Sequence, residues 1–351
     1  MLLEGIFPAI TTPFHTDGGL YLRKLEMNVE RYSRAPVSGL VVLGSTGEAV
    51  MLSDEESREV LRTARAAASP QKVLLAGVGR ESAVATLKLA EFAAGQQYDA
   101  VLVRTPSYYS PQMQVLEMLT YFRMVADRSP LPVVLYSIPK FTKYELSIEL
   151  VAELSQHPNI IGIKDSSGSI ERVAQLVSVT RNAPRRTTVV TNVFTAFTNR
   201  MLQEQALADT TFVPADVLGL GAPAAIAPPG PKIATRTREV GFQVLSGSPD
   251  NVKEALDTGA SGAVLAFGAC APQACQEIYM AWKDNDAKLA QLKQERIKEA
   301  SRIVAGKFGV PGIKFACDLN GYYGGVPRVP LLPLKAEEQS VVTKAMEDVR
   351  N

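Results

Sequence analysis

The chain has 351 residues, of which 46% are hydrophobic and 21% charged. This composition is typical of a folded globular protein. The length is sufficient for one large domain plus an appendage, or for two domains. Its net charge of +1 gives no electrostatic reason to expect nucleic acid or an anionic membrane as a partner. No run approaches the roughly 20 apolar residues of a membrane span, and the N-terminus lacks the pattern of a signal peptide. We therefore expect a cytoplasmic protein.

Cysteine and histidine are scarce. The three cysteines, Cys270, Cys275 and Cys317, are expected to be reduced thiols, because an odd, small number without an export signal does not indicate a disulfide framework. The two histidines do not cluster with cysteines or carboxylates at ligand spacing, so we expect no metal site.

Short apolar runs recur along the chain and alternate with helical segments. Most are rich in β-branched residues and are predicted to be buried on both faces, which is typical of a parallel sheet. Eight strands are predicted, at 6–10, 39–44, 73–78, 100–104, 133–136, 160–164, 242–246 and 262–266.

Helices are predicted between these strands. Ser53 and Glu56 form a capping-box pattern at the start of one of them, and others are expected at 81–94, 115–127, 147–155, 169–180 and 248–259. Eight strands with crossover helices predict an α/β fold, the (β/α)8 TIM barrel. The alternative is a doubly wound sheet, which usually has fewer strands and whose Gly-x-Gly-x-x-Gly signature does not follow the first strand here.

Two regions exceed a minimal barrel. The barrel is predicted at 1–270, interrupted by an insertion at 183–240 between the sixth helix and the seventh strand; a helical region follows at 271–351. Because the insertion joins a helix to the next strand, it should emerge at the N-terminal face, opposite the face where barrel active sites lie. We expect it to be structural, interfacial or partly mobile, with a strand at 187–197, a helical turn at 198–205 and a loop at 222–231. The C-terminal helices are expected to cover the barrel or to build a subunit interface.

Lys164 is the strongest candidate for chemistry, because it ends the apolar run of the sixth strand just before a glycine-containing turn. Burying a cation costs free energy, so a lysine in a buried position is expected to have a function or a charged partner. A lysine in an apolar pocket loses its proton more easily and becomes the amine nucleophile that forms Schiff bases with carbonyl compounds. The alternative is a surface lysine or an ion-pair partner.

A turn at 44–48, just after the second predicted strand, could bind an anionic group. Its two glycines, one of them Gly47, permit unusual backbone angles, so that successive N–H groups can surround an anion. The hydroxyls of Ser45 and Thr46 add donors. The alternative is an ordinary tight turn.

Other side chains follow neighbouring strand ends. The Tyr136 phenol ends the fifth strand and could relay protons, and Tyr108 lies in a loop after the fourth; in isolation, either could be a packed or rim aromatic. Gly247 and Ser248 end the seventh strand and could line the same opening. Asp165 is expected to bind backbone N–H groups rather than to act as an acid.

Taken together, these segments resemble the dihydrodipicolinate synthase/N-acetylneuraminate lyase family of pyruvate-type class I aldolases. The matching elements are Pro13 and Phe14, 44–48, Tyr108, 136–139, 162–165, 246–247 and 311–314. The segments 133–137, 154–159 and 321–325 are most similar to the 4-hydroxy-2-oxoglutarate aldolase branch of that family.

The resemblance implies a role for each matching residue. Lys164 would form the imine with pyruvate or a 2-oxo acid, so that no separate cofactor is needed, and Tyr136 would move the proton. Ser45 would link Tyr136 to the Tyr108 of a neighbouring subunit in a homo-oligomer, either a dimer or a homotetramer built from two dimers. Ser45 and Thr46 would hold the carboxylate, while Gly247 and Val264 would line the pocket.

One departure from the family bears on the substrate. Synthases of this family carry an arginine shortly after the Tyr-x-x-Pro element, where this chain has Phe141 between Lys140 and Lys143. An aromatic side chain cannot supply a bidentate fork, and lysine is not equivalent to arginine.

We therefore predict a lyase that cleaves a 4-hydroxy-2-oxo acid to pyruvate and an aldehyde such as glyoxylate. The alternatives are a synthase that condenses pyruvate with aspartate semialdehyde, an aldolase for 2-keto-3-deoxy sugar acids, or a non-catalytic barrel that binds sugar acids.

Overall fold

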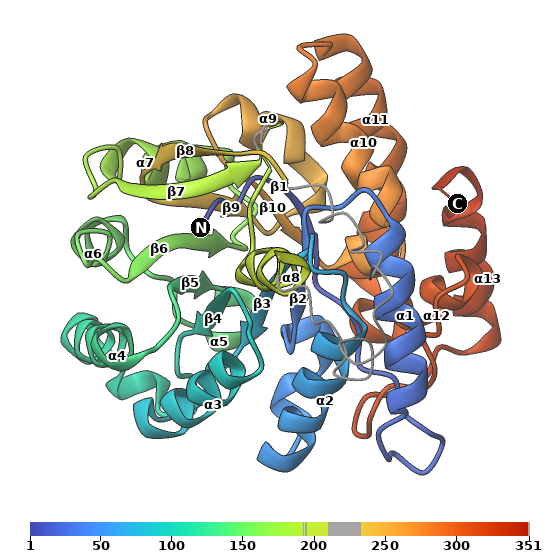
Figure 1. Ribbon diagram of the computed structural model, residues 1–351. Helices are drawn as coiled ribbons and strands as arrows, with labels where there is room; N and C mark the ends of the chain where they lie inside the picture. The colour runs from blue at the N-terminus through green and yellow to red at the C-terminus, as the bar shows by residue number, and fades with distance from the viewer. Residues whose placement is uncertain (192, 194, 210–232, 350–351) are drawn as a thin grey trace, which may run out of the picture.

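The computed structural model describes residues 1–191, 193, 195–209 and 233–349. Eight parallel strands form one sheet in the order β1-β10-β9-β6-β5-β4-β3-β2. The two outer strands are joined by a parallel bridge between Ala9 and Val41, so the sheet closes into a barrel that helices surround (Figure 1). The predicted (β/α)8 barrel is confirmed. Its strands are β1 (Gly5–Pro8), β2 (Gly39–Val42), β3 (Val73–Gly77), β4 (Ala100–Arg104), β5 (Val133–Ser137), β6 (Ile160–Asp165), β9 (Gln243–Ser246) and β10 (Gly262–Leu265).

Six of the helices around the barrel fall close to the predicted positions, and the structure adds α1 and the short α5, which were not predicted. They are α1 (Leu22–Arg34), α2 (Asp54–Ala67), α3 (Ala83–Gly95), α4 (Val115–Arg128), the short α5 (Pro139–Thr142), α6 (Ile148–Leu154), α7 (Ile170–Val179) and α9 (Val252–Asp257). The capping box at the start of α2 is present: Ser53 Oγ accepts from the Glu56 N–H, and the Glu56 carboxylate accepts from the Ser53 N–H. Four further helices follow the barrel, namely α10 (Pro272–Lys283), α11 (Ala287–Ser301), α12 (Gly309–Leu319) and α13 (Ala336–Ala345).

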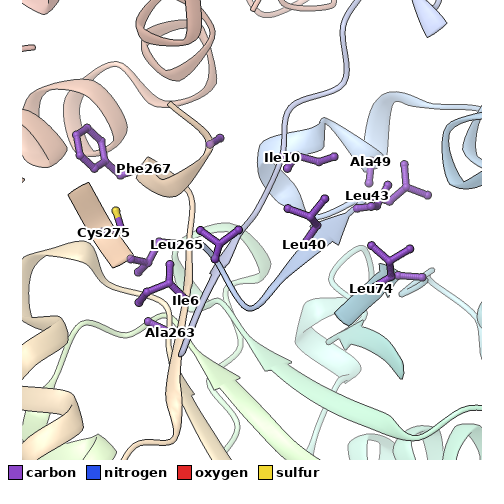
Figure 2. Close-up of a cluster of buried hydrophobic side chains, with 14 of the residues drawn as sticks. Ile6, Ile10, Leu40, Leu43, Ala49, Leu74, Ala263, Leu265, Phe267 and Cys275 are labelled. Atoms are coloured by element: carbon purple, nitrogen blue, oxygen red, sulfur yellow. The ribbon is translucent and has the colours of Figure 1, made fainter. Parts of the chain in front are cut away.

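Alternating side chains of the strands build two apolar cores. Successive residues of a strand point to opposite faces. Ile6 and Leu40 therefore pack outward against the helices, as Figure 2 shows, while Phe7 and Val41 fill the barrel interior. Because all of these residues are fully buried, the strands lack the polar alternation of a half-exposed sheet, which explains why they were recognisable as continuous apolar runs.

The described residues of the insertion lie at the N-terminal face of the barrel, as predicted. β7 (Arg186–Thr191) and β8 (Thr235–Val240) pair as a two-stranded antiparallel sheet. Between them in sequence is α8 (Asn199–Asp209), which lies in front of the barrel strands in Figure 1. Arg200 of α8 donates to the carbonyl of Lys72 and lies 3.3 Å from the carboxylate of Asp99, and both acceptors precede the N-terminal ends of strands. The predicted strand and helical turn correspond to β7 and α8, whereas β8 was not predicted. The loop expected at 222–231 lies outside the described residues.

Candidate active site

Lys164 and Tyr136 are neighbours at the C-terminal ends of adjacent strands. The register of β5 and β6 pairs Tyr136 with Lys164. Both side chains are buried, with exposed fractions of 4% and 5%, and Lys164 Nζ lies 4.1 Å from the centre of the Tyr136 ring. The lysine therefore points into the mouth of the barrel, and a surface position is excluded.

The turn after β2 brings a hydroxyl to the same place. Residues Ser45–Gly47 form a single 3-10 turn, which ends at Glu48 in the left-handed region at φ 55°. Ser45 Oγ lies 3.3 Å from the hydroxyl of Tyr136, and either oxygen can be the donor. A proton can therefore pass between these two groups.

A buried ion pair holds this turn against the C-terminal helices. The Glu48 carboxylate lies 2.7 Å from Lys314 Nζ of α12, and each side chain is 1% exposed. The other Glu48 oxygen accepts the backbone N–H of Arg328 at 2.8 Å. Burial lowers the pKa of Lys314, and the Glu48 carboxylate acts in the opposite direction. Lys314 is thus engaged in a structural ion pair. Lys164 differs, because no carboxylate of the described residues lies within ion-pair distance of its amine; even the neighbouring Asp165 pairs with Arg172 instead.

A cavity of about 280 Å³ opens above Lys164. Seven of the ten predicted site residues line it: Ser45, Thr46, Tyr136, Phe141, Lys164, Gly247 and Ser248. Phe141 stands at the rim with 60% of its surface exposed. The cavity is slightly smaller than the usual range of roughly 300–1,000 Å³ for small-molecule sites, so it suits a compact substrate.

The other three predicted residues are not among the described residues that line this cavity. Gly47 is buried behind the turn, where its carbonyl accepts the Thr12 hydroxyl at 2.7 Å. Val264 lies in the core of the barrel interior. Tyr108 is 78% exposed on the outer surface.

A network of hydrogen bonds positions the Tyr108 loop. The Glu81 carboxylate accepts the backbone N–H groups of Ser107 and Tyr108, both at 2.9 Å, and Arg104 at 2.8 Å. Burial alone would raise the pKa of Glu81, but these N–H groups and the arginine together lower it below its usual value. The loop is therefore anchored in its exposed position by an ionised carboxylate.

Asp165 binds a backbone N–H group, as expected, and it also binds Arg172, which was not predicted. It accepts the N–H of Ser167 at 3.1 Å, and its second oxygen accepts from Arg172 Nε of α7 at 2.8 Å. Because its oxygens are occupied by these donors, Asp165 orients the turn after β6 and leaves Lys164 free to face the cavity.

Sequence reasoning missed the part of the cavity wall that comes from the C-terminal region. A π-helical segment, Arg302–Lys307, connects α11 to α12, and Arg302, Ala305 and Gly306 line the cavity. These residues follow a charged helix and carry no local signal of a site, since only the folding of that region against the barrel brings them to its mouth.

A closed barrel with a buried lysine at the end of its sixth strand defines the class of Schiff-base-forming barrel enzymes. Residues 2–186 and 232–349 match the model of the Dihydrodipicolinate synthetase family. The chain belongs to this family, whose members are pyruvate-dependent class I aldolases that work through a covalent imine on a lysine, without a separate cofactor.

Relatives and solved structures agree with this assignment. A 4-hydroxy-tetrahydrodipicolinate synthase of Methanothrix thermoacetophila is 30% identical over 97% of this chain and 94% of its own. A synthase of the same name from Xanthomonas campestris pv. campestris is 43% identical over 51% of this chain and 59% of its own. YagE, a prophage protein of the dihydrodipicolinic acid synthase family from E. coli K12 solved in complex with pyruvate, is 25% identical, with a TM-score of 0.78 over 99% of both chains. These relatives are named for the synthase family, so the closer likeness to 4-hydroxy-2-oxoglutarate aldolase stays a prediction.

Within the described residues, no helix is both long and apolar enough to cross a bilayer, and no group of three or more histidines, cysteines and carboxylates is arranged to hold a metal ion.

Proposed function

We propose that this enzyme cleaves a 4-hydroxy-2-oxo acid to pyruvate and an aldehyde through an imine on Lys164. The observation that carries the proposal is the buried Lys164 amine beside Tyr136, at the base of a cavity that also holds the hydroxyl turn. In its neutral form, Nζ attacks the C2 ketone, and with one proton taken up from solvent, water leaves and a protonated imine remains. Thr46, which lines the same cavity, and the Ser45 turn hold the adjacent carboxylate through their N–H and hydroxyl groups.

The protonated imine is the electron sink for carbon–carbon cleavage. The proton of the substrate's 4-hydroxyl passes to the Tyr136 oxygen as Tyr136 gives its own proton to Ser45 across their 3.3 Å contact, and Ser45 releases its hydroxyl proton to solvent. The C3–C4 bond then breaks, C4 becomes the aldehyde carbonyl, and the bonding electrons move to the imine to form an enamine. Protonation of the enamine at C3, followed by hydrolysis, releases pyruvate and restores the Lys164 amine.

The identity of the aldehyde separates two candidate functions. Glyoxylate as product, from 4-hydroxy-2-oxoglutarate, is supported by Phe141, which occupies the position where the family's synthases carry an arginine fork. A synthase that condenses pyruvate with aspartate semialdehyde is supported by the names of the relatives. Turnover measured on both aldehydes with pyruvate distinguishes the two. Phe141→Arg should increase synthase activity if this position selects the acceptor.

The predicted homo-oligomer belongs to the same proposal. Tyr108 extends from the outer surface with 78% of its surface exposed. This exposure supports contact of Tyr108 with a neighbouring copy, where it would reach Ser45. A cytoplasmic location likewise stays a prediction.

Borohydride trapping tests the central step. With pyruvate and borohydride, wild-type protein should gain one reduced pyruvate adduct, and peptide mass mapping should locate it on Lys164. Lys164→Ala should lose both the adduct and turnover, whereas Lys293→Ala, which removes a lysine paired with Glu277 away from the cavity, should keep both. An adduct on another lysine, or turnover by Lys164→Ala, would contradict the proposal. Pyruvate binding without imine formation would favour the non-catalytic alternative.

A further inference from the structure

Two cations besides Lys164 line the cavity. Lys140 follows β5 and Arg302 opens the π-helical segment after α11, and both line the cavity above Lys164. π-Helical turns inside helices occur frequently at functional sites. Here the segment also brings the small residues Ala305 and Gly306 to the wall, which leaves room beside the arginine.

Arg302, whose side chain is 60% exposed, is anchored through one nitrogen of its guanidinium. Its Nε donates to Asp250 Oδ2 at 2.9 Å, and the Ser301 hydroxyl donates to the other oxygen of the same carboxylate at 3.2 Å. Within the part of the chain that the structure describes, neither Nη group of Arg302 has a hydrogen-bond partner. Two free parallel N–H donors on a planar guanidinium match the geometry of a carboxylate.

The charges that line the cavity favour a substrate with two separated anionic groups. Lys164, Lys140 and Arg302 are the lining cations, and Asp250 is the only lining carboxylate among the described residues. One substrate carboxylate is assigned to the turn at Ser45, so the surplus positive charge at the rim has no partner there. Phe141, whose ring centre lies 5.9 Å from Lys140 Nζ, provides an apolar surface but no donor.

We propose that Arg302, assisted by Lys140, binds a second carboxylate at the aldehyde end of the substrate. This inference rests on the proposed function and narrows its substrate class. The enzyme selects aldehydes that carry a carboxylate over neutral aldehydes of the same length, and this argues against sugar-derived substrates. Arg302 is a specificity residue that contacts the substrate away from the breaking bond, and Asp250 positions it.

Paired substrates that differ only in this carboxylate test the inference. For cleavage the pair is 4-hydroxy-2-oxoglutarate and 4-hydroxy-2-oxopentanoate, in which a methyl group replaces the carboxylate. For synthase activity it is aspartate semialdehyde and 3-aminopropanal. Arg302→Ala should increase KM for the carboxylate-bearing member by roughly 10- to 100-fold, the effect of losing a charge-assisted hydrogen bond. The KM for the member that lacks this carboxylate and both kcat values should change by less than about twofold.

Two further variants sharpen the result. Lys140→Ala should give a smaller increase in the same KM, and Arg302→Lys should lie between Arg302→Ala and wild type, since a point charge replaces the fork. Arg123→Ala is the control, because Arg123 is similarly exposed and pairs with Glu153 on the outer helices; its kinetics should match those of wild type.

The outcomes separate this inference from the proposed function. Borohydride trapping of pyruvate on Lys164 should be unchanged in Arg302→Ala. If trapping succeeds but Arg302→Ala affects both members of a pair equally, or neither, or if wild type prefers the members that lack the second carboxylate, the carboxylate assignment is wrong while the imine mechanism stands. If wild type shows no trapping and no turnover, the proposed function itself is wrong and the inference is overturned with it.

Discussion

Replacing Lys314 with methionine should strongly destabilise the protein. Lys314 Nζ lies 2.7 Å from the Glu48 carboxylate and donates to the carbonyl of Val326 at 2.8 Å. Because both charged side chains are 1% exposed, the methionine would leave the Glu48 carboxylate buried without its cation. Breaking a buried ion pair in this way costs about 3–5 kcal/mol.

The matched control removes both charges. In the double variant Lys314→Met with Glu48→Gln, no uncompensated charge remains, and the glutamine oxygen can still accept the Arg328 N–H that Glu48 accepts at 2.8 Å. The double variant should therefore recover most of the lost stability, because replacing both members of a buried pair by neutral groups is often close to neutral. The expected pattern is one strongly destabilising single change and a much milder double change.

Urea unfolding monitored by fluorescence of Trp282, the single tryptophan, measures this cycle. Glu48 directly follows the turn that carries Ser45, so kcat should decrease in Lys314→Met and return in the double variant. The reasoning is refuted if Lys314→Met costs less than about 1 kcal/mol, the value of a surface pair, or if the double variant is as unstable as the sum of the two single changes.

Two further predictions concern the groups around the imine. Tyr136→Phe removes the hydroxyl 3.3 Å from Ser45 and should lower kcat by about 10²–10⁴-fold, the usual contribution of a positioned proton-transfer group, with circular dichroism unchanged; an unaltered kcat would exclude the relay. Glu81→Gln weakens the anchor of the Tyr108 loop and should cost about 0.5–1 kcal/mol at pH 7, since the carboxylate is partly exposed. Folding lowers the Glu81 pKa. The difference in unfolding free energy between wild type and Glu81→Gln should therefore be complete above the pKa of the unfolded chain, about 4.3. It should disappear as the pH falls through the pKa of Glu81 in the folded protein. Urea unfolding of both proteins from pH 7 to pH 3 measures it, and a constant difference would contradict the assignment.

Much of the barrel was predictable because the information is local. A strand buried on both faces has to be apolar throughout, so 160–164 and the other seven runs were recognisable without any knowledge of their partners. The capping box at Ser53 and Glu56 was equally visible, since its hydrogen bonds join residues three positions apart. Lys164 was conspicuous because a cation at the end of such a run contradicts its apolar surroundings.

The features that escaped prediction depend on contacts between distant segments. Strand β8 has a poorly buried, charged sequence and exists because it pairs with β7 some fifty residues earlier. The ion pair of Glu48 with Lys314 joins positions far apart in the chain, and no spacing rule connects them.

The amino-acid sequence by itself determined the closed barrel, the lysine at the end of its sixth strand and the hydroxyl turn nearby, because hydrophobic periodicity and strand-end position are properties of short segments. Only the tertiary structure decided which side chains share the cavity. It placed Arg302 at the rim, left Val264 in the barrel interior and turned Tyr108 outward. The physical reason is that a site is defined by distances in space, which depend on how the C-terminal helices pack against the barrel.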